Sequence, residues 1–162
     1  MTRALAPLLL LLAACGFQLR GETSLPFETL YVPGATSGIA LDLKRHIQSG
    51  SATRVVDDPK AAEAQLLFAG ETRGKEILAL NSAGRVQEYR LYYRVSFRVA
   101  DGKGGDYVPH STVSLQRDIT YDESVALAKE TEEQLLFRDM QSDMVRQILR
   151  RIAAARAVPK AN

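Results

Sequence analysis

The chain has 162 residues, of which 46% are hydrophobic and 25% charged, and this size and composition fit one folded domain without repeats or low-complexity segments. The formal net charge of +2 excludes a global field that would attract polyanions, so any anion binding must be local. A single cysteine excludes a disulfide framework, so the core must be stable by itself.

The first fifteen residues have the pattern of a bacterial lipoprotein signal. Arg3 supplies the positive start, residues 4–12 form a short apolar stretch, and Leu12-Ala13-Ala14 precede Cys15 as they would at a cleavage site. We therefore predict a signal peptide over residues 1–14, with a diacylglycerol and an N-acyl chain attached to Cys15 after cleavage. Two or three acyl chains anchor a protein firmly, because each buried CH₂ contributes about 0.8 kcal/mol.

Other interpretations of this segment are less consistent with its length. A transmembrane helix needs about 20 apolar residues, whereas the apolar stretch ends before Arg20. A plain secretory signal followed by an incidental free cysteine is the remaining alternative. Cleavage would remove 14 of 162 residues and one of 21 basic residues, leaving 148 residues with 20 basic and 19 acidic side chains. The cleaved chain would therefore be nearly neutral.

The segment after the anchor is predicted to begin with a tether, a short strand and a helix. Residues 15–26 form the lipidated tether, and residues 29–32 read as a strand ended by the Pro33-Gly34 turn. In the helix that follows, Ile39, Leu43 and Ile47 recur every four residues, so this apolar stripe should face a sheet. Thr36 or Ser37 can cap its start, and Gly50 is a plausible stop.

Two predicted strands of different length and regularity follow this helix. Residues 53–56 are predicted to form a second short strand, and Leu66 opens a longer one that runs unevenly to Leu80. Gly70 and Gly74 indicate a bulge or a break within the longer strand.

The clearest strand of the chain covers residues 85–100. Its apolar and polar residues alternate, which is typical of a half-buried antiparallel strand. The apolar set is Tyr89, Leu91, Tyr93, Val95, Phe97 and Val99. Turns over residues 81–84 and 101–106 join it to its neighbours, and Val113, Leu115 and Ile119 mark the next strand. Two hairpins in series therefore form a meander.

The last element is a long amphipathic helix over about residues 122–151, and a Thr131/Gln134 capping box predicts a restart or kink within it. Its apolar face consists of Leu136, Met140, Met144, Val145, Ile148, Leu149 and Ile152. We therefore predict an α+β fold in which two helices cover one face of a mixed, roughly four-stranded sheet. The predicted single domain spans residues 27–155, and a frayed tail follows over 156–162.

No catalytic or metal-binding arrangement is visible in the sequence. It lacks a G-x-S-x-G motif, and its only thiol is assigned to lipid. His46 and His110 are interpreted as packing or surface residues, since a zinc site needs more ligands at closer spacing. Residues 101–106 resemble a calcium loop only faintly and are interpreted as a glycine-rich turn. The prediction is therefore a non-enzyme without cofactor or metal.

Two basic features remain. Arg90, Arg94 and Arg98 share the polar face of the best strand at intervals of roughly 13 Å, which forms a row suited to a large polyanion or a polar wall. The alternative is that they solvate an open sheet face and pair with Glu88 or other acids. Nucleic acid is disfavoured because the protein is exported. The second feature is Lys129 near the start of the long helix, and Arg73, Lys75 and Arg85 are expected at the adjoining end of the sheet.

These residues resemble a known family, the LptE lipopolysaccharide-assembly lipoproteins of the Gram-negative outer membrane. Residues 15–21, Cys-Gly-Phe-Gln-Leu-Arg-Gly, are similar to the family's opening C-G-[FW]-H-L-R, with Gln18 in place of the commoner histidine. The strand-turn-strand with Gly84 and Glu88-Tyr89 and the segment 126–130, Ala-Leu-Ala-Lys-Glu, match further motifs. A long helix with Glu133-Gln134 and Met140 completes the match, which covers nearly the whole chain.

The resemblance implies two helices on a four-stranded sheet and a role as a plug inside the large β-barrel LptD. Such proteins assist assembly of that barrel and interact with lipopolysaccharide on its way to the cell surface. The polar strand face, with Arg90, Tyr92, Arg94 and Arg98, would then meet the polar wall of the barrel lumen. Gly16, rather than aspartate, follows the anchor, so we expect the periplasmic face of the outer membrane.

The resemblance also implies a site for lipopolysaccharide. Lys129 occupies the motif position where a basic residue is associated with lipopolysaccharide contact, whereas Ser82 stands where relatives can carry another basic residue. Arg85 is the substitute nearest to that turn. The competing class is an independent, periplasm-facing binding or scaffolding lipoprotein that uses the same sheet face for another partner. A lipid-anchored hydrolase has the least support, since no nucleophile and base can be paired.

Overall fold

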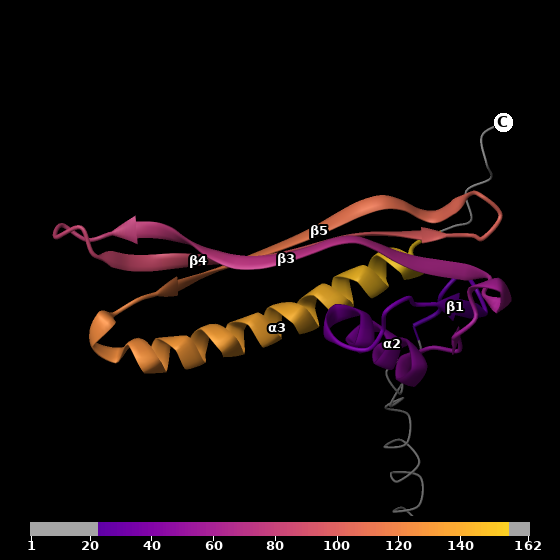
Figure 1. Cartoon of the computed structure of the whole chain (residues 1–162), viewed down its shortest axis with the longest axis horizontal. Helices are drawn as coiled ribbons and strands as arrows, with labels where there is room; N and C mark the ends of the chain where they lie inside the picture. The colour runs from indigo at the N-terminus through magenta and orange to yellow at the C-terminus, as the bar shows by residue number, and fades with distance from the viewer. Residues whose placement is uncertain (1–22, 156–162) are drawn as a thin grey trace, which may run out of the picture.

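The structure is a computed structural model that describes residues 23–155 (Figure 1). The predictions for Cys15, the signal peptide 1–14, most of the tether and the tail 156–162 lie outside the described residues. The elements are β1 (Thr29–Tyr31), α2 (Gly38–Gly50), β2 (Arg54–Val56), β3 (Ala64–Leu80), β4 (Val86–Ala100), β5 (Asp106–Thr120) and α3 (Ala126–Ala153). Short 3₁₀ turns, η2 (Pro59–Ala61) and η3 (Glu123–Val125), precede β3 and α3.

The sheet has five strands in the order β2-β1-β3-β4-β5 and is mixed. The three-residue strand β1 pairs in parallel with both β2 and β3, while β3, β4 and β5 form the predicted antiparallel meander. The expected count of roughly four strands is therefore wrong. Both short strands belong to the sheet, because β1 has a hydrogen-bonded neighbour on each of its two edges.

The core lies between the sheet and α3. Met140, Met144, Val145, Ile148 and Ile152 of α3 are buried, as are the five alternating β4 residues from Leu91 to Val99. Each fully buried side chain of this size contributes about 1.5–3 kcal/mol relative to exposure, so this layer dominates the stability of the domain. The predicted alternation of the best strand and the apolar stripe of the long helix are thereby confirmed.

The two helices contact different parts of the sheet. Helix α3 packs on β4 and β5 along the long strands, whereas α2 contacts β2 and α3 near the β1 end (Figure 1). The prediction that both helices cover the same face of one sheet is therefore inexact, because α2 lies against the short parallel strands and the flank of α3. Gln141 of α3 donates a hydrogen bond of 2.6 Å to Asp42 of α2 and joins the two helices.

Strand β3 is continuous but irregular. Its register with β4 shifts between Phe68 and Gly70, so the bulge lies at Ala69, next to Gly70, and the register shifts again between Ile77 and Leu80. Gly74 instead remains in register and pairs with Tyr92. The strand therefore does not break at either glycine, and β3 and β4 form one long hairpin beside α3 (Figure 1).

Helix α3 runs without a restart through Thr131. The Thr131 hydroxyl donates to the carbonyl of Leu127, which is a bond within the helix rather than a cap at its start. The prediction of a restart at Thr131 is therefore wrong. The 3₁₀ turn η3, which leads into α3, is capped by Asp122, whose carboxylate accepts from the backbone N–H and the hydroxyl of Ser124.

The two hairpin turns are closed by acceptor side chains at their first residues. Oδ1 of Asn81 accepts from the backbone N–H groups of Ala83 and Arg85 at 3.0 Å each, and Gly84 takes the left-handed conformation with φ +75°. Oδ1 of Asp101 accepts from Lys103 and Gly105 at 2.8 Å each, and these donors lower the pKa of Asp101. Residues 101–106 thus form the predicted turn.

Candidate functional site

The face of the sheet opposite α3, called the outer face here, carries the predicted arginine row. The side chains at Arg90, Tyr92, Arg94 and Arg98 alternate with the buried apolar residues of β4 and so lie on this face. The row is thus confirmed as a feature of one surface, and each arginine has a partner on β5.

The arginines bond laterally across the β4–β5 pairing. Arg90 donates from Nε and Nη2 to the two carboxylate oxygens of Asp118, at 2.8 and 3.1 Å. The carboxylate of Asp118 raises the pKa of Arg90, and the guanidinium in turn lowers the pKa of Asp118. Arg98 lies 3.5 Å from the carboxylate of Asp106, and Nε of Arg94 donates to the Ser114 hydroxyl at 3.1 Å.

This pairing changes the electrostatic interpretation of the row. Two of its three guanidinium groups have a carboxylate within 4 Å, so the expected pairing with acids of the sheet is present, with Asp118 and Asp106 of β5 as the partners. In residues 23–155, Arg94 has no such carboxylate. The outer face is therefore polar and hydrogen-bonded with little excess charge, which suits a polar wall better than a large polyanion.

The predicted lipopolysaccharide contact Lys129 is already engaged within the protein. Its Nζ donates to the Thr120 hydroxyl at 3.2 Å and to Glu132 at 2.9 Å, and its side chain is only 19% exposed. The bond to Thr120 joins the first turn of α3 to the end of β5, whereas the bond to Glu132 lies within α3. A lipid phosphate at this ammonium group would compete with the carboxylate of Glu132 for its charge.

Arg85 lies at a cavity of about 700 Å³ beside the β3–β4 turn, called the distal cavity here. Its lining is Asn81, Gly84, Arg85, Val86, Gln87, Tyr89, Tyr121, Asp122 and Glu123. The rings of Tyr89 and Tyr121 meet edge to face with centroids 5.2 Å apart. The lining carries one guanidinium and two carboxylates, so an anion would bind here only with help from a further cation.

Lys129 is next to the distal cavity but does not line it. The pKa of Asp122, which does line it, is lowered by hydrogen bonds from the Ser124 side chain and backbone and, less strongly, by the charge of Lys129. Asp122 thus lines the same cavity as Arg85 and experiences the charge of Lys129. Ser82 belongs to the same turn and is exposed.

The other two predicted bases, Arg73 and Lys75, connect β3 to α3. Nζ of Lys75 lies 2.6 Å from Glu133 and 5.0 Å from the centroid of the Tyr89 ring, and the bond to Glu133 raises the pKa of Lys75. The guanidinium of Arg73 stacks over Phe137 at 5.7 Å. These side chains therefore point to the helix side of the sheet, away from the arginine row.

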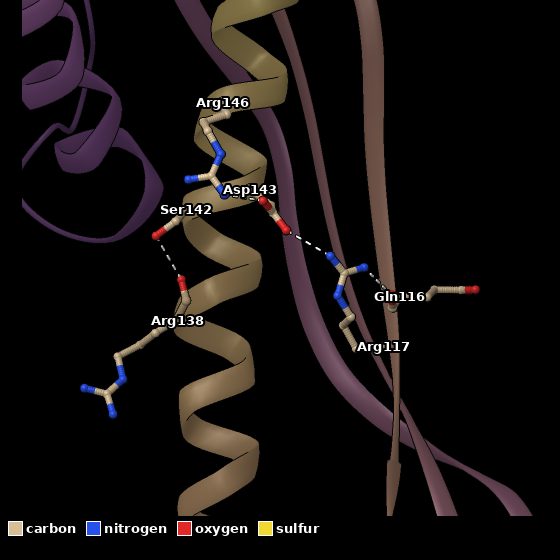
Figure 2. A network of polar contacts seen from close by, with 6 residues as sticks. All are labelled: Gln116, Arg117, Arg138, Ser142, Asp143 and Arg146. Atoms are coloured by element: carbon tan, nitrogen blue, oxygen red, sulfur yellow. Dashed lines mark hydrogen bonds and ion pairs between the residues drawn. The ribbon is translucent and has the colours of Figure 1, made fainter.

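The sequence reasoning did not identify an ion cluster between β5 and α3, which Figure 2 shows. Nη2 of Arg117 donates to Asp143 at 2.9 Å, Arg146 donates to the other oxygen of Asp143, and Nη1 of Arg117 donates to the Gln116 carbonyl. A signal was present, because Arg117 occupies the position between Leu115 and Ile119 that the strand alternation assigns to apolar residues.

The described part of the chain, residues 23–155, has no group of three or more His, Cys, Asp or Glu residues that could hold a metal ion. The ring of His46 contacts the carbonyl of Asp42 at 2.9 Å on α2, and His110 is exposed on β5. Among the same residues, no helix combines the length and the apolarity that a membrane crossing requires.

The fold is shared with a class of small α+β lipoprotein domains. A solution NMR structure of lipoprotein B from Nitrosomonas europaea superposes with a TM-score of 0.74 at 38% identity, covering 86% of this chain and 91% of that one. The crystal structure of the rare lipoprotein B from Shewanella oneidensis has a TM-score of 0.66 at 25% identity, covering 78% of this chain and 92% of that chain.

Sequence comparison gives the family. The model of the family LptE, described as lipopolysaccharide-assembly, matches residues 27–152. The LPS-assembly lipoprotein LptE of Yersinia enterocolitica is 29% identical over 152 residues, which cover 91% of this chain and 72% of the relative. Its counterpart from Photorhabdus laumondii is 24% identical and covers 94% and 84%. The chain belongs to the LptE family of lipopolysaccharide-assembly lipoproteins.

Proposed function

We propose that this protein is an outer-membrane lipoprotein that plugs the LptD β-barrel, helps to assemble it, and assists the insertion of lipopolysaccharide into the outer leaflet. The lipid on Cys15 would hold it at the periplasmic face of that membrane. The observation that carries the proposal is the outer face of the sheet, considered together with membership of the LptE family.

The chemistry of the outer face supports a position against a barrel wall. The interior of a large transmembrane barrel is polar, so a protein inside it must present polar groups along its length. Strand β4 presents Arg90, Tyr92, Arg94 and Arg98 on one side, and β5 supplies hydrogen-bond partners to Arg90 and Arg94 and an ion-pair partner to Arg98. A laterally paired arginine retains free donors with which it can bond a second acceptor.

Lipopolysaccharide would bind at the end of the molecule that holds the β3–β4 turn. Lipid A phosphates are strong acceptors for charge-assisted hydrogen bonds from lysine and arginine. Arg85 is exposed at the distal cavity, and the charge of Lys129 acts on Asp122, which also lines that cavity. Exposed apolar side chains, namely Ile77, Leu78, Leu80, Val125 and Leu127, gather in the same segments and would suit the acyl chains of a lipid.

Site-specific photo-crosslinking in cells tests the position inside the barrel. Photoreactive residues at Arg90, Tyr92 and Arg94 should each capture the barrel, whereas one at the exposed Arg45 on α2 serves as the surface control. If capture occurred only from the apolar side, for example at Val95, the assigned orientation of the sheet would be wrong. Capture of an unrelated protein from all three outer positions would favour the alternative, an independent periplasm-facing scaffold.

A further inference from the structure

The two edges of the sheet differ in how their backbone groups are covered. At the β5 edge, the Thr112 carbonyl accepts from Arg151 at 2.8 Å and the Gln116 carbonyl accepts from Arg117 at 2.9 Å. Pro109 also removes one N–H donor from this strand. Such devices prevent another strand from pairing with an edge. Two carbonyls of the β5 edge are therefore already bonded to arginine side chains.

The opposite edge, along β3, has no comparable cover. Strand β1 pairs with β3 only at Ala64 and Gln65. Within the described residues, no side chain, loop or other strand hydrogen-bonds the backbone of residues 71–77 on the side away from β4. This stretch is thus an open edge next to the region where β3 contacts α3.

The alternation of the ladders identifies which backbone groups are free. The carbonyls of Thr112 and Gln116 on β5 point away from β4. Their cross-strand partners on β4, Ser96 and Tyr92, therefore direct their backbone N–H and C=O groups toward β3. Tyr92 then bonds its partner Gly74. The intervening β3 residues, Arg73 and Lys75, therefore present their N–H and C=O groups at the open edge.

A groove of about 600 Å³ runs beside this edge, between β3 and α3. It is lined by Arg73, Gly74, Glu133, Gln134, Phe137 and Arg138. A free strand edge with a helix-walled groove next to it is the geometry in which an extended peptide adds to a sheet as another strand. Main-chain bonds then supply affinity, and alternate side chains enter the groove.

The charges along the groove specify the occupant. Lys75 already neutralises Glu133 at 2.6 Å, and Tyr93 already donates to Glu71 at 2.6 Å. Arg73 and Arg138, in contrast, have no carboxylate within 4 Å among the described residues. The groove therefore has two guanidinium groups without a carboxylate partner, of which that of Arg73 lies over the apolar ring of Phe137.

These charges disfavour a second copy of the chain. An antiparallel pair of β3 strands centred on Arg73 would place two Arg73 side chains opposite each other, and like charges in that position are destabilising. On the helix side of the sheet, β3 could supply an acid only by withdrawing Glu71 from the hydroxyl of Tyr93, because its other acid, Glu76, pairs opposite Arg90 and faces the outer side. A partner segment with its own acidic side chain avoids both costs.

We propose that an acidic, extended segment of the barrel partner adds as a strand to the open edge of β3, with its acidic side chain between Arg73 and Arg138. This inference rests on the proposed function, because the barrel supplies the segment. It adds a second contact surface on the helix side of the sheet, separate from the outer face.

Amide hydrogen exchange on the full-length protein, alone and in the purified complex with its barrel, tests the strand addition. In the complex, the amides of Arg73 and Lys75 should exchange roughly 100-fold more slowly than in the isolated protein. The amides of Thr72 and Gly74, which already bond to β4, should change little. Equally fast exchange of the Arg73 and Lys75 amides in both samples would overturn the inference.

Two further outcomes separate this inference from the proposed function. Protection of Arg73 and Lys75 already in the isolated protein would assign the edge to a second copy or to another segment of this chain. Absence of any barrel from the purified material would reject the proposed function and this occupant together. A complex that forms with an unprotected edge would reject only the strand addition.

A charge variant provides an independent measurement. Arg138→Glu should abolish most of the protection at Arg73 and Lys75 in the complex, because it repels an acidic segment. Arg45→Glu, an exposed arginine on α2 away from the groove, is the matched control and should leave that protection unchanged. Full protection in a folded Arg138→Glu complex would exclude the assigned charge recognition.

Discussion

The ring of Tyr92 lies across Gly74 on the outer face of the sheet. The two residues are cross-strand partners, and a Cβ atom at position 74 would lie 2.6 Å from the Tyr92 hydroxyl oxygen. Gly74 therefore leaves room for a ring that covers the strand, rather than marking a break in it. The arrangement also fixes the orientation of Tyr92, one of the residues proposed to meet the barrel.

Substitution of Gly74 should reveal this contact in a double-mutant cycle. Gly74→Ala should lower the free energy of unfolding by about 1 kcal/mol in the wild-type background, since the tyrosine must move. In a Tyr92→Ala background the same change should be neutral or stabilising, because alanine restricts the unfolded chain. Urea unfolding of the four proteins measures the coupling. Equal effects of Gly74→Ala in both backgrounds would contradict the contact.

The Arg90–Asp118 pair should make stability fall in acid. Arg90 holds the pKa of Asp118 below its ordinary value of about 3.9, so below that pH the unfolded chain binds more protons than the folded one. The contribution of the pair is therefore complete above about pH 4 and is lost as the pH falls further. Asp118→Asn should flatten the acid side of the urea-midpoint profile, whereas an unchanged slope would show that the pair is unimportant.

The proposed lipopolysaccharide site leads us to expect opposite effects for two changes around Lys129. Lys129→Asp combined with Arg85→Asp should reduce lipopolysaccharide binding and make cells more permeable to large antibiotics. Glu132→Gln should increase binding, because it releases the Lys129 ammonium group. Lys60→Asp, at an exposed lysine in the 3₁₀ turn η2, is the control. Unchanged binding by a folded double variant would move the site elsewhere.

The double variant also needs a stability measurement. Lys129 is mostly covered and bonded to Thr120, so its charge reversal should cost about 1 kcal/mol, more than at a typical exposed position. Thermal unfolding shows whether the variant is folded under the binding conditions.

The Leu12-Ala13-Ala14-Cys15 pattern predicts an acylated mature N-terminus. Mass spectrometry of the purified protein should find Cys15 as the first residue, carrying diacylglycerol and an N-linked acyl chain. Cys15→Ser should leave the precursor unprocessed and absent from the outer-membrane fraction. An unmodified thiol at Cys15 in the mature protein would instead support a plain secretory signal.

The fold was predictable where one periodicity continues over many residues. The alternation of β4 and the stripe from Met140 to Ile152 follow directly from burial of one face. The strand count was harder, because β1 and β2 have three residues each and their pairing depends on the rest of the sheet. Continuity of α3 through Thr131 was also ambiguous, since a threonine hydroxyl can cap a helix or bond within it.

The candidate site was predictable only as a set of side chains on a face. Alternation placed Arg90, Arg94 and Arg98 on one side, but their acidic partners come from β5 and depend on the register of the hairpin. Lys129 stood out through its motif, whereas its bonds to Glu132 and Thr120 depend on how α3 docks. The open edge of β3 depends on where β1 ends, which no local pattern indicates.

The most direct test of the proposed role is the composition of the complex that leaves the membrane with this protein. The native, untagged partner should be identified after mild detergent extraction and affinity purification of the full-length protein. We predict an outer-membrane β-barrel, LptD, in a 1:1 ratio, which is retained after Cys15→Ser in protein that reaches the periplasm through a substituted secretory signal. Purification of the folded protein alone, or with a partner other than a barrel, would contradict the plug function.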